Sequence, residues 1–300
     1  MDLLGQIVSY VYQYFDNSAF LLLSAVGLIL IYGMMGVINM AHGELMMIGA
    51  FGAAFSYHAG IPLPLAIIAG GLAATIVGLI LERLVIRHLY GRLLYSLVAT
   101  WGLSLILSQG ALLVLGPSTL GIPSDLGNLS FDGLTFSLYR LMLFAIAVAI
   151  IVALWALLRF TPFGLHARAT MSSPEMAEAL GVETTRIYMI TFGLGSFLAG
   201  IAGGLFAMTA PVQPTFGAAY TPIAFIVVVV AGTRNIIVGL TTSILILALV
   251  KTAFTINVNI LTGYVAMLVA TLVIIRSSPD GITELLDRGR NLLKPRPASR

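Results

Sequence analysis

Seven long apolar runs constrain this 300-residue sequence more than any other feature. A helix needs about 20 apolar residues to cross the hydrocarbon core of a bilayer. Only helices satisfy all of their own backbone hydrogen bonds in lipid, and the alternating pattern of a transmembrane barrel is absent. We therefore predict an all-α, polytopic membrane helical bundle with spans at about 18–38, 63–86, 93–116, 138–158, 187–209, 236–254 and 259–275.

The composition supports the same fold class. Charged residues make up 9% of the chain and hydrophobic residues 59%, whereas soluble domains carry roughly 25% charged residues. The absence of cysteine excludes disulfides and thiolate chemistry. Two shorter apolar runs, 44–58 and 219–232, either cross the bilayer or are re-entrant, which gives about eight or nine membrane segments.

Basic residues predict the orientation, because cytoplasmic loops are enriched in Lys and Arg. They gather between the second and third spans, in the polar segment (residues 159–186) and in the tail after Arg276. The loop 116–137 has acidic residues and no basic ones. We expect one permease domain, 1–280, with its N-terminus outside, followed by a basic cytoplasmic tail, 281–300.

The polar segment, between the fourth and fifth long spans, has the pattern of a short capped helix. Ser172 or Ser173 can cap its start, Pro174 suits the first helical position and Glu175 faces the positive end of the helix. Gly181 can end it. A polar helix of this kind between two apolar spans is typical of a docking surface for a soluble partner, although an ordinary solvated loop helix has the same pattern.

Two motifs carry a resemblance to a known family. Glu175, Ala177 and Gly181 match the Glu-Ala-Ala-x-x-x-Gly loop of ABC importer permeases, with Met176 in place of the first alanine. The segment Ile31–Phe51, IYGMMGVINMAHGELMMIGAF, resembles the signature of branched-chain amino acid permeases of the LivH type, whose close relatives import urea and short amides. The resemblance covers residues 18–285.

This resemblance implies a bacterial inner-membrane permease subunit of an ATP-driven importer for branched-chain or related amino acids. It assigns coupling to the ATPase to Pro174, Glu175, Ala177, Glu178 and Gly181. The chain has no phosphate loop. We therefore expect no enzymatic activity and no cofactor of its own, since ATP is bound by two separate ATPase subunits. A second homologous permease and a periplasmic solute-binding protein complete the expected assembly.

Two other functions remain open at this point. The same machinery could import urea or short amides, because the segment Ile31–Phe51 suits that branch equally well. A self-powered secondary transporter or channel is the alternative from another class, and it would need a site for a coupling ion.

Two short, glycine-interrupted segments, 39–49 and 231–239, predict the substrate pathway or its gate, since broken helices commonly build such sites. Both segments could instead lie at the cytoplasmic boundary, and Glu44 could pair with Arg234. Lys251 lies near the outer end of its span, where it either snorkels to the interface or contacts a substrate carboxylate. The candidate pathway residues are Asn39, His42, Gly43, Glu44, Gly232, Arg234, Asn235 and Lys251.

Metal chemistry finds no support in the sequence. The four histidines, His42, His58, His88 and His166, lie in separate segments, and His42 and Glu44 lack His-Glu-x-x-His spacing. We expect no metal site and no catalytic residues.

Overall fold

Helices make up nearly all of the chain that the computed structural model describes, namely residues 3–117, 120–123, 127–131, 134–233, 235–278 and 281–284. Among these residues, seven helices are long and apolar enough to cross a membrane: α1 (Leu3–Met35), α3 (Leu63–Leu84), α4 (Leu93–Leu115), α5 (Leu138–Phe160), α8 (Thr184–Phe206), α10 (Ile236–Asn257) and α11 (Ile260–Ser277). The predicted all-α membrane bundle is confirmed.

The two shorter apolar runs are also helical. They form α2 (His42–His58) and α9 (Phe216–Ala231). The first predicted span starts too late, because α1 begins at Leu3 and has polar residues along its first turns. Most of the predicted tail, residues 285–300, lies outside the described residues.

Three smaller features lie at the ends of the long helices. A short 3₁₀ helix, η1 (Ile86–Leu89), follows α3, and the polar segment folds into α6 (Pro162–Ser172) and α7 (Pro174–Ala179). Strands β1 (Asn128–Phe131) and β2 (Leu134–Ser137) pair antiparallel, with Asn128 opposite Ser137. No strand was predicted in the loop 116–137, so the hairpin is a difference from the predicted all-α fold.

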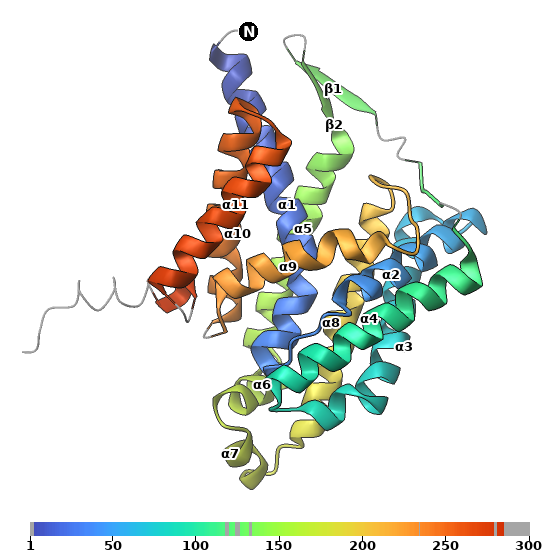
Figure 1. Ribbon diagram of the computed structural model, residues 1–300, viewed down its shortest axis with the longest axis vertical. Helices are drawn as coiled ribbons and strands as arrows, with labels where there is room; N and C mark the ends of the chain where they lie inside the picture. The colour runs from blue at the N-terminus through green and yellow to red at the C-terminus, as the bar shows by residue number, and fades with distance from the viewer. Residues whose placement is uncertain are drawn as a thin grey trace, which may run out of the picture.

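The molecule has two distinct ends (Figure 1). The N-terminus and the β1–β2 hairpin lie at one end, called here the N-terminal end, and α6 and α7 lie at the opposite one, the α7 end. Helices α10 and α11 lie beside α1, while α3, α4 and α8 form the other side of the bundle. Helix α9 runs from α10 across the bundle towards α2, which packs against α3 and α8.

Helix α1 lies at the centre of the bundle. Within its most apolar stretch, 83% of the residues are buried, whereas the corresponding value for α4 is 6%. Since both helices are similarly apolar, the difference reflects position: α1 packs against protein and α4 faces outward along almost its whole length.

Glycines allow α2, α3 and α8 to pack closely. A Cβ atom added at Gly49 of α2 would lie 2.2 Å from the Cα atom of Gly200 in α8. A Cβ atom at Gly70 of α3 would lie 2.2 Å from the carbonyl oxygen of Gly49. Lipid provides little hydrophobic force between helices, so their association depends on such close backbone contact. Gly49, within the segment Ile31–Phe51, therefore allows this close helix approach.

We predict that Gly49→Ala destabilises the folded bundle, because the new methyl group would overlap the backbone of α8. Overpacking of this kind costs roughly 1–3 kcal/mol, which should lower the melting temperature of the detergent-purified protein. Gly102→Ala in α4 is the matched control, because a Cβ atom there meets nothing within 4 Å. Equal melting temperatures for the two variants would contradict the close-packing account.

Candidate functional site

The helical path is interrupted between α1 and α2. Residues 36–41 are not in a regular helix, and Gly36 has a φ of +62°. Residues other than glycine rarely adopt this conformation. The chain then turns back along α1. This turn brings His42 Nε2 to 2.9 Å from the carbonyl oxygen of Ser24. Helix α2 therefore starts beside the middle of α1, not beside its end.

Thr100 of α4 forms hydrogen bonds with the non-helical backbone of residues 36–41. Its hydroxyl accepts a hydrogen bond from the Met40 N–H at 3.0 Å and lies 3.1 Å from the Ile38 carbonyl oxygen, to which it can donate. Asn39 Oδ1 accepts from the Ala41 N–H at 3.1 Å. Non-helical backbone within a membrane protein needs partners of this kind. No sequence pattern singles out Thr100, since a threonine in an apolar span commonly bonds only its own helix.

Asn39, His42 and Glu44 are buried together at this break, with exposures of 1%, 0% and 4%. Each keeps a buried polar atom with no protein partner: Asn39 Nδ2, His42 Nδ1 and Glu44 Oε2. Because the Ser24 carbonyl only accepts, His42 Nε2 donates to it, and Nδ1 of a neutral ring remains an acceptor. The break thus offers a donor and two acceptors to a water molecule or a small polar ligand. These three side chains face the interior of the bundle and not water.

Gly43 fixes the contact of this break with α9. A Cβ atom at Gly43 would lie 2.1 Å from Thr221 Oγ1 and 2.3 Å from the carbonyl oxygen of Gly217. Both partners belong to the first half of α9. The break therefore lies against the start of α9, and not against the segment 231–239 that follows its end.

The segment 231–239 packs elsewhere. A Cβ atom at Gly281 would lie 2.6 Å from the Cα atom of Gly232, and Ser278 Oγ donates to the Gly281 carbonyl oxygen at 2.9 Å. Asn235 caps α10 by accepting from the Val238 N–H. Arg234 lies outside the described residues. The corner between α9 and α10 is thus closed by the turn after α11, and the structure does not bring it together with Asn39, His42, Gly43 and Glu44.

Lys251 occupies a third place, near the N-terminal end. Its side chain is 5% exposed, and Nζ lies 5.0 Å from the ring centroid of Phe20 and 4.2 Å from that of Tyr264. Lys251 is therefore buried inside the bundle and does not extend from its surface. An ion pair between Asp16 of α1 and Arg140 of α5 lines the same cavity. Neither residue was a candidate from the sequence, although both are charged residues near the same end of apolar helices.

The proposed coupling residues form a compact corner at the α7 end. Ser173 caps α7 by accepting from the Met176 N–H, Pro174 is the first helical residue, and Gly181 has a φ of +87°. These local expectations are confirmed. Ala177 is buried, whereas Pro174, Glu175 and Glu178 are exposed.

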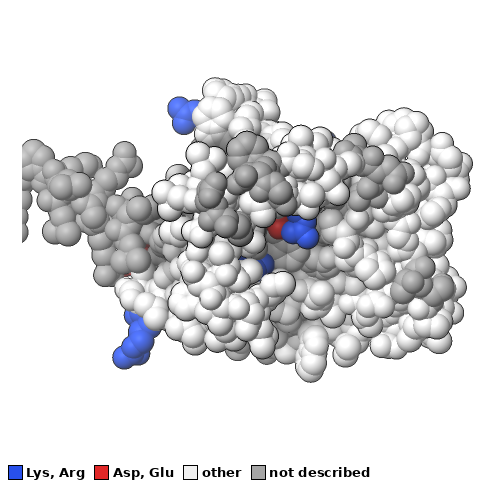
Figure 2. Space-filling model, turned by 90° about the horizontal axis from the view of Figure 1, so that it is seen from above, with Lys and Arg blue, Asp and Glu red and all other residues white. Residues whose placement is uncertain are grey.

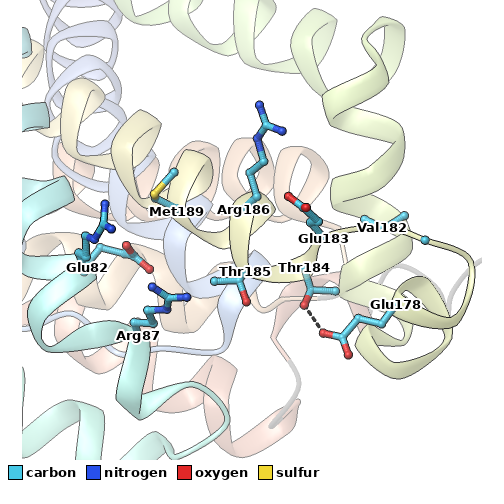
Figure 3. A pocket seen from close by; sticks show the side chains of 11 residues that line it. Glu82, Arg87, Glu178, Val182, Glu183, Thr184, Thr185, Arg186 and Met189 are labelled. Carbon is cyan, nitrogen blue, oxygen red and sulfur yellow. Dashed lines mark hydrogen bonds between the residues drawn. The ribbon is translucent and has the colours of Figure 1, made fainter.

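A cleft of about 710 Å³ adjoins this corner (Figure 3). Glu82 and Arg87 line one side, and Glu178, Thr184 and Thr185 line the other. The Thr184 hydroxyl donates to Glu178, which ties α8 to α7.

Glu82 lines this cleft and was not a candidate from the sequence. It is 1% exposed and accepts a hydrogen bond from the Tyr90 hydroxyl. Burial, with a further contribution from Glu82, raises the pKa of Tyr90 above its ordinary value. Its position directly before Arg83, at the end of an apolar span, is the sequence feature that could have identified Glu82.

No group of three potential metal ligands (His, Cys, Asp or Glu) occurs within the described part of the chain. The polar features are instead the break at α2, the cavity at Lys251 and the cleft beside α7. Polar side chains are thereby spread along the bundle from the N-terminal end to the α7 end, which suits passage of a solute better than chemistry at one centre.

Comparison with known proteins agrees with this arrangement. The model of the family described as branched-chain amino acid transport system permease component matches residues 11–277. The high-affinity branched-chain amino acid permease protein BraD of Pseudomonas aeruginosa is 30% identical over 202 residues, 62% of this chain and 66% of that protein. LivH of Escherichia coli K12 is 28% identical over 199 residues, 61% of this chain and 65% of that protein.

The similarity also reaches an archaeal relative. The probable LivH of Methanocaldococcus jannaschii is 28% identical over 291 residues, 89% of each chain. The chain spans about two thirds of the length of the first two relatives, and no solved structure matches it significantly. Because the family match includes all seven long apolar helices at least in large part, this multi-pass membrane chain belongs to the family of branched-chain amino acid transport system permease components.

Proposed function

We propose that this chain is the permease subunit of an ATP-driven importer for branched-chain amino acids. The observation that carries the proposal is the family match over residues 11–277, together with relatives whose names specify that transport. The sequence has no phosphate loop. We therefore assign ATP binding and hydrolysis to separate subunits, and no enzymatic step or cofactor to this chain.

We place the α7 end in the cytoplasm and the N-terminal end outside. Arg83, Arg87, Arg159, Arg168 and Arg186 all belong to the ends or connections of helices at the α7 end. This charge distribution follows the positive-inside rule. The resemblance to bacterial permeases supports the inner membrane as the location.

The α7 corner has the features of a docking site for an ATPase subunit. Met176 and Leu180 are 62% and 78% exposed, although both are large and apolar. Burying such a side chain in an interface contributes about 1.5–3 kcal/mol. The neighbouring cleft, lined in part by Glu178 and Gly181, adds acidic and basic side chains to this end of the molecule.

Movement of a bound ATPase would reach the membrane-spanning helices through the link between α7 and α8 and then through the packing of α8. Thr184, the first residue of α8, is bonded to Glu178 at the end of α7. Helix α8 packs on α1, α2 and α3. A displacement of α7 would therefore be transmitted to the helices around the break at Asn39 and His42.

The remaining partners follow from the importer assembly. We propose a second homologous permease, two ATPase subunits and an extracytoplasmic binding protein that docks at the N-terminal end. The outward faces of α4 and α11 offer apolar surface for lipid and for the second permease, since both helices are largely unburied.

We predict that the intact importer, expressed in a strain lacking its own branched-chain amino acid uptake, takes up labelled leucine and that excess urea does not reduce this uptake. The binding-protein and ATPase genes need to be expressed with the permease. Omitting the ATPase is the control and should abolish uptake. Uptake of urea with no uptake of leucine would overturn the substrate assignment.

We predict that Met176→Gln combined with Leu180→Gln lowers uptake and substrate-stimulated ATP hydrolysis tenfold or more, because the two lost apolar contacts together weaken ATPase docking by about 3 kcal/mol, which is roughly a hundredfold in affinity. Leu165→Gln is the matched control, since Leu165 is 60% exposed but belongs to α6 and not to the α7 corner. Membrane insertion should be normal in both variants. Unchanged ATP hydrolysis in the double variant would exclude this docking surface.

A further inference from the structure

A cavity of about 530 Å³ opens at the N-terminal end between α1, β2, α5, α10 and α11. Seen from that end, acidic and basic atoms lie together in a hollow of the face, while the other blue atoms in view lie at its outline (Figure 2). Small-molecule sites commonly have volumes of about 300–1,000 Å³. The cavity is therefore large enough for an amino acid.

Lys251 is the most deeply buried charge of this cavity. Its side chain is 95% buried, and no carboxylate of the described residues lies within ion-pair distance of its ammonium. The faces of Phe20 and Tyr264 contribute cation–π attraction. Burying an unpaired charge is nevertheless costly, so an anion that enters the cavity gains from neutralising it.

The close approach of α10 and α11 positions this lysine. A Cβ atom at Gly263 would lie 2.1 Å from Thr255 Oγ1 and 2.9 Å from the Lys251 carbonyl oxygen. Glycine is therefore needed for α11 to come near enough to set Tyr264 over the ammonium. The contact also holds Lys251 on the face of α10 that meets α11.

Thr255 supplies a second polar group. It lies one helical turn after Lys251, on the same face of α10, and it lines the cavity. Its hydroxyl oxygen is buried with no hydrogen-bond partner in the protein. A hydroxyl can donate to a carboxylate oxygen, so Lys251 and Thr255 present two donors from one helix.

The rest of the cavity is mixed in character. Asp16 and Arg140 form an ion pair and are 22% and 50% exposed. Phe20, Leu143 and Phe206 supply apolar surface. An inorganic anion would leave this surface uncovered, whereas an organic carboxylate with an alkyl side chain would cover it.

We infer that this cavity is a binding site for the transported amino acid, with Lys251 pairing with its carboxylate and Thr255 donating to it. The alkyl side chain of the ligand lies against Leu143 and Phe206. This inference rests on the proposed function and adds to it a site within the permease itself, distinct from any site on the binding protein.

The experiment measures equilibrium binding to the permease complex in the absence of the binding protein. The complex, with its ATPases, is placed in nanodiscs without serine headgroups, so that no lipid supplies a carboxylate. The probe is labelled leucine. The competitors are 4-methylpentanoate, which has the carboxylate and no ammonium, and 3-methylbutylamine, which has the ammonium and no carboxylate.

Lys251→Met should weaken binding of leucine and of 4-methylpentanoate about tenfold or more, because a charged hydrogen bond is lost. Lys251→Arg should retain most of the affinity. Thr255→Val should weaken binding about three- to tenfold. Thr242→Val is the matched control on the same helix, since its hydroxyl donates to the Val238 carbonyl oxygen at 2.7 Å, and it should bind leucine as the wild type does.

Equal affinity of the wild type and Lys251→Met for 4-methylpentanoate would overturn the inference, as would a wild-type complex that binds neither carboxylate. If Lys251→Met fails to assemble, equal affinity of Thr255→Val and Thr242→Val overturns it. These outcomes are separable from the substrate assignment: leucine uptake by the intact importer with no effect at Lys251 or Thr255 leaves the proposed function standing and removes only this site.

Discussion

The need to satisfy backbone groups away from water governs the centre of this structure. Residues 36–41 leave the helical path, so their N–H and carbonyl groups lack helical hydrogen bonds. Each such group would raise the free energy of the folded protein if it had no other partner. Thr100 of α4 and Asn39 supply those partners. The position of α2, its contact with α9 and the burial of His42 all follow from this one supported break.

Close contact between glycines makes the break possible. Gly43 brings α2 against Gly217 of α9, and Gly49 brings it against Gly200 of α8. These contacts leave no space for side chains between the backbones, so α2 cannot shift without moving its neighbours. Since α8 continues directly from the α7 corner, the break and the proposed docking surface belong to one connected set of helices.

Much of this arrangement could be predicted from the sequence. The long apolar runs identify the spanning helices, and Ser173, Pro174 and Gly181 correctly predict the start and end of α7, because capping depends on neighbouring residues. The partner of the break could not be predicted in this way. Thr100 lies about 60 positions from Met40, and Lys251 meets Phe20 across most of the chain. Such contacts depend on how helices pack, which hydrophobic periodicity does not encode.

The contact between Gly232 and Gly281 has a consequence for how the molecule is completed during synthesis. The turn that contains Gly281 follows α11, yet it closes the corner before α10. The contact at that corner therefore cannot form until α11 has been inserted and the residues that follow it have been synthesised. A premature stop after α11, or a rigid fusion placed there, would leave all the long apolar helices in the bilayer. It would still remove the contact between Gly281 and Gly232 that closes this corner.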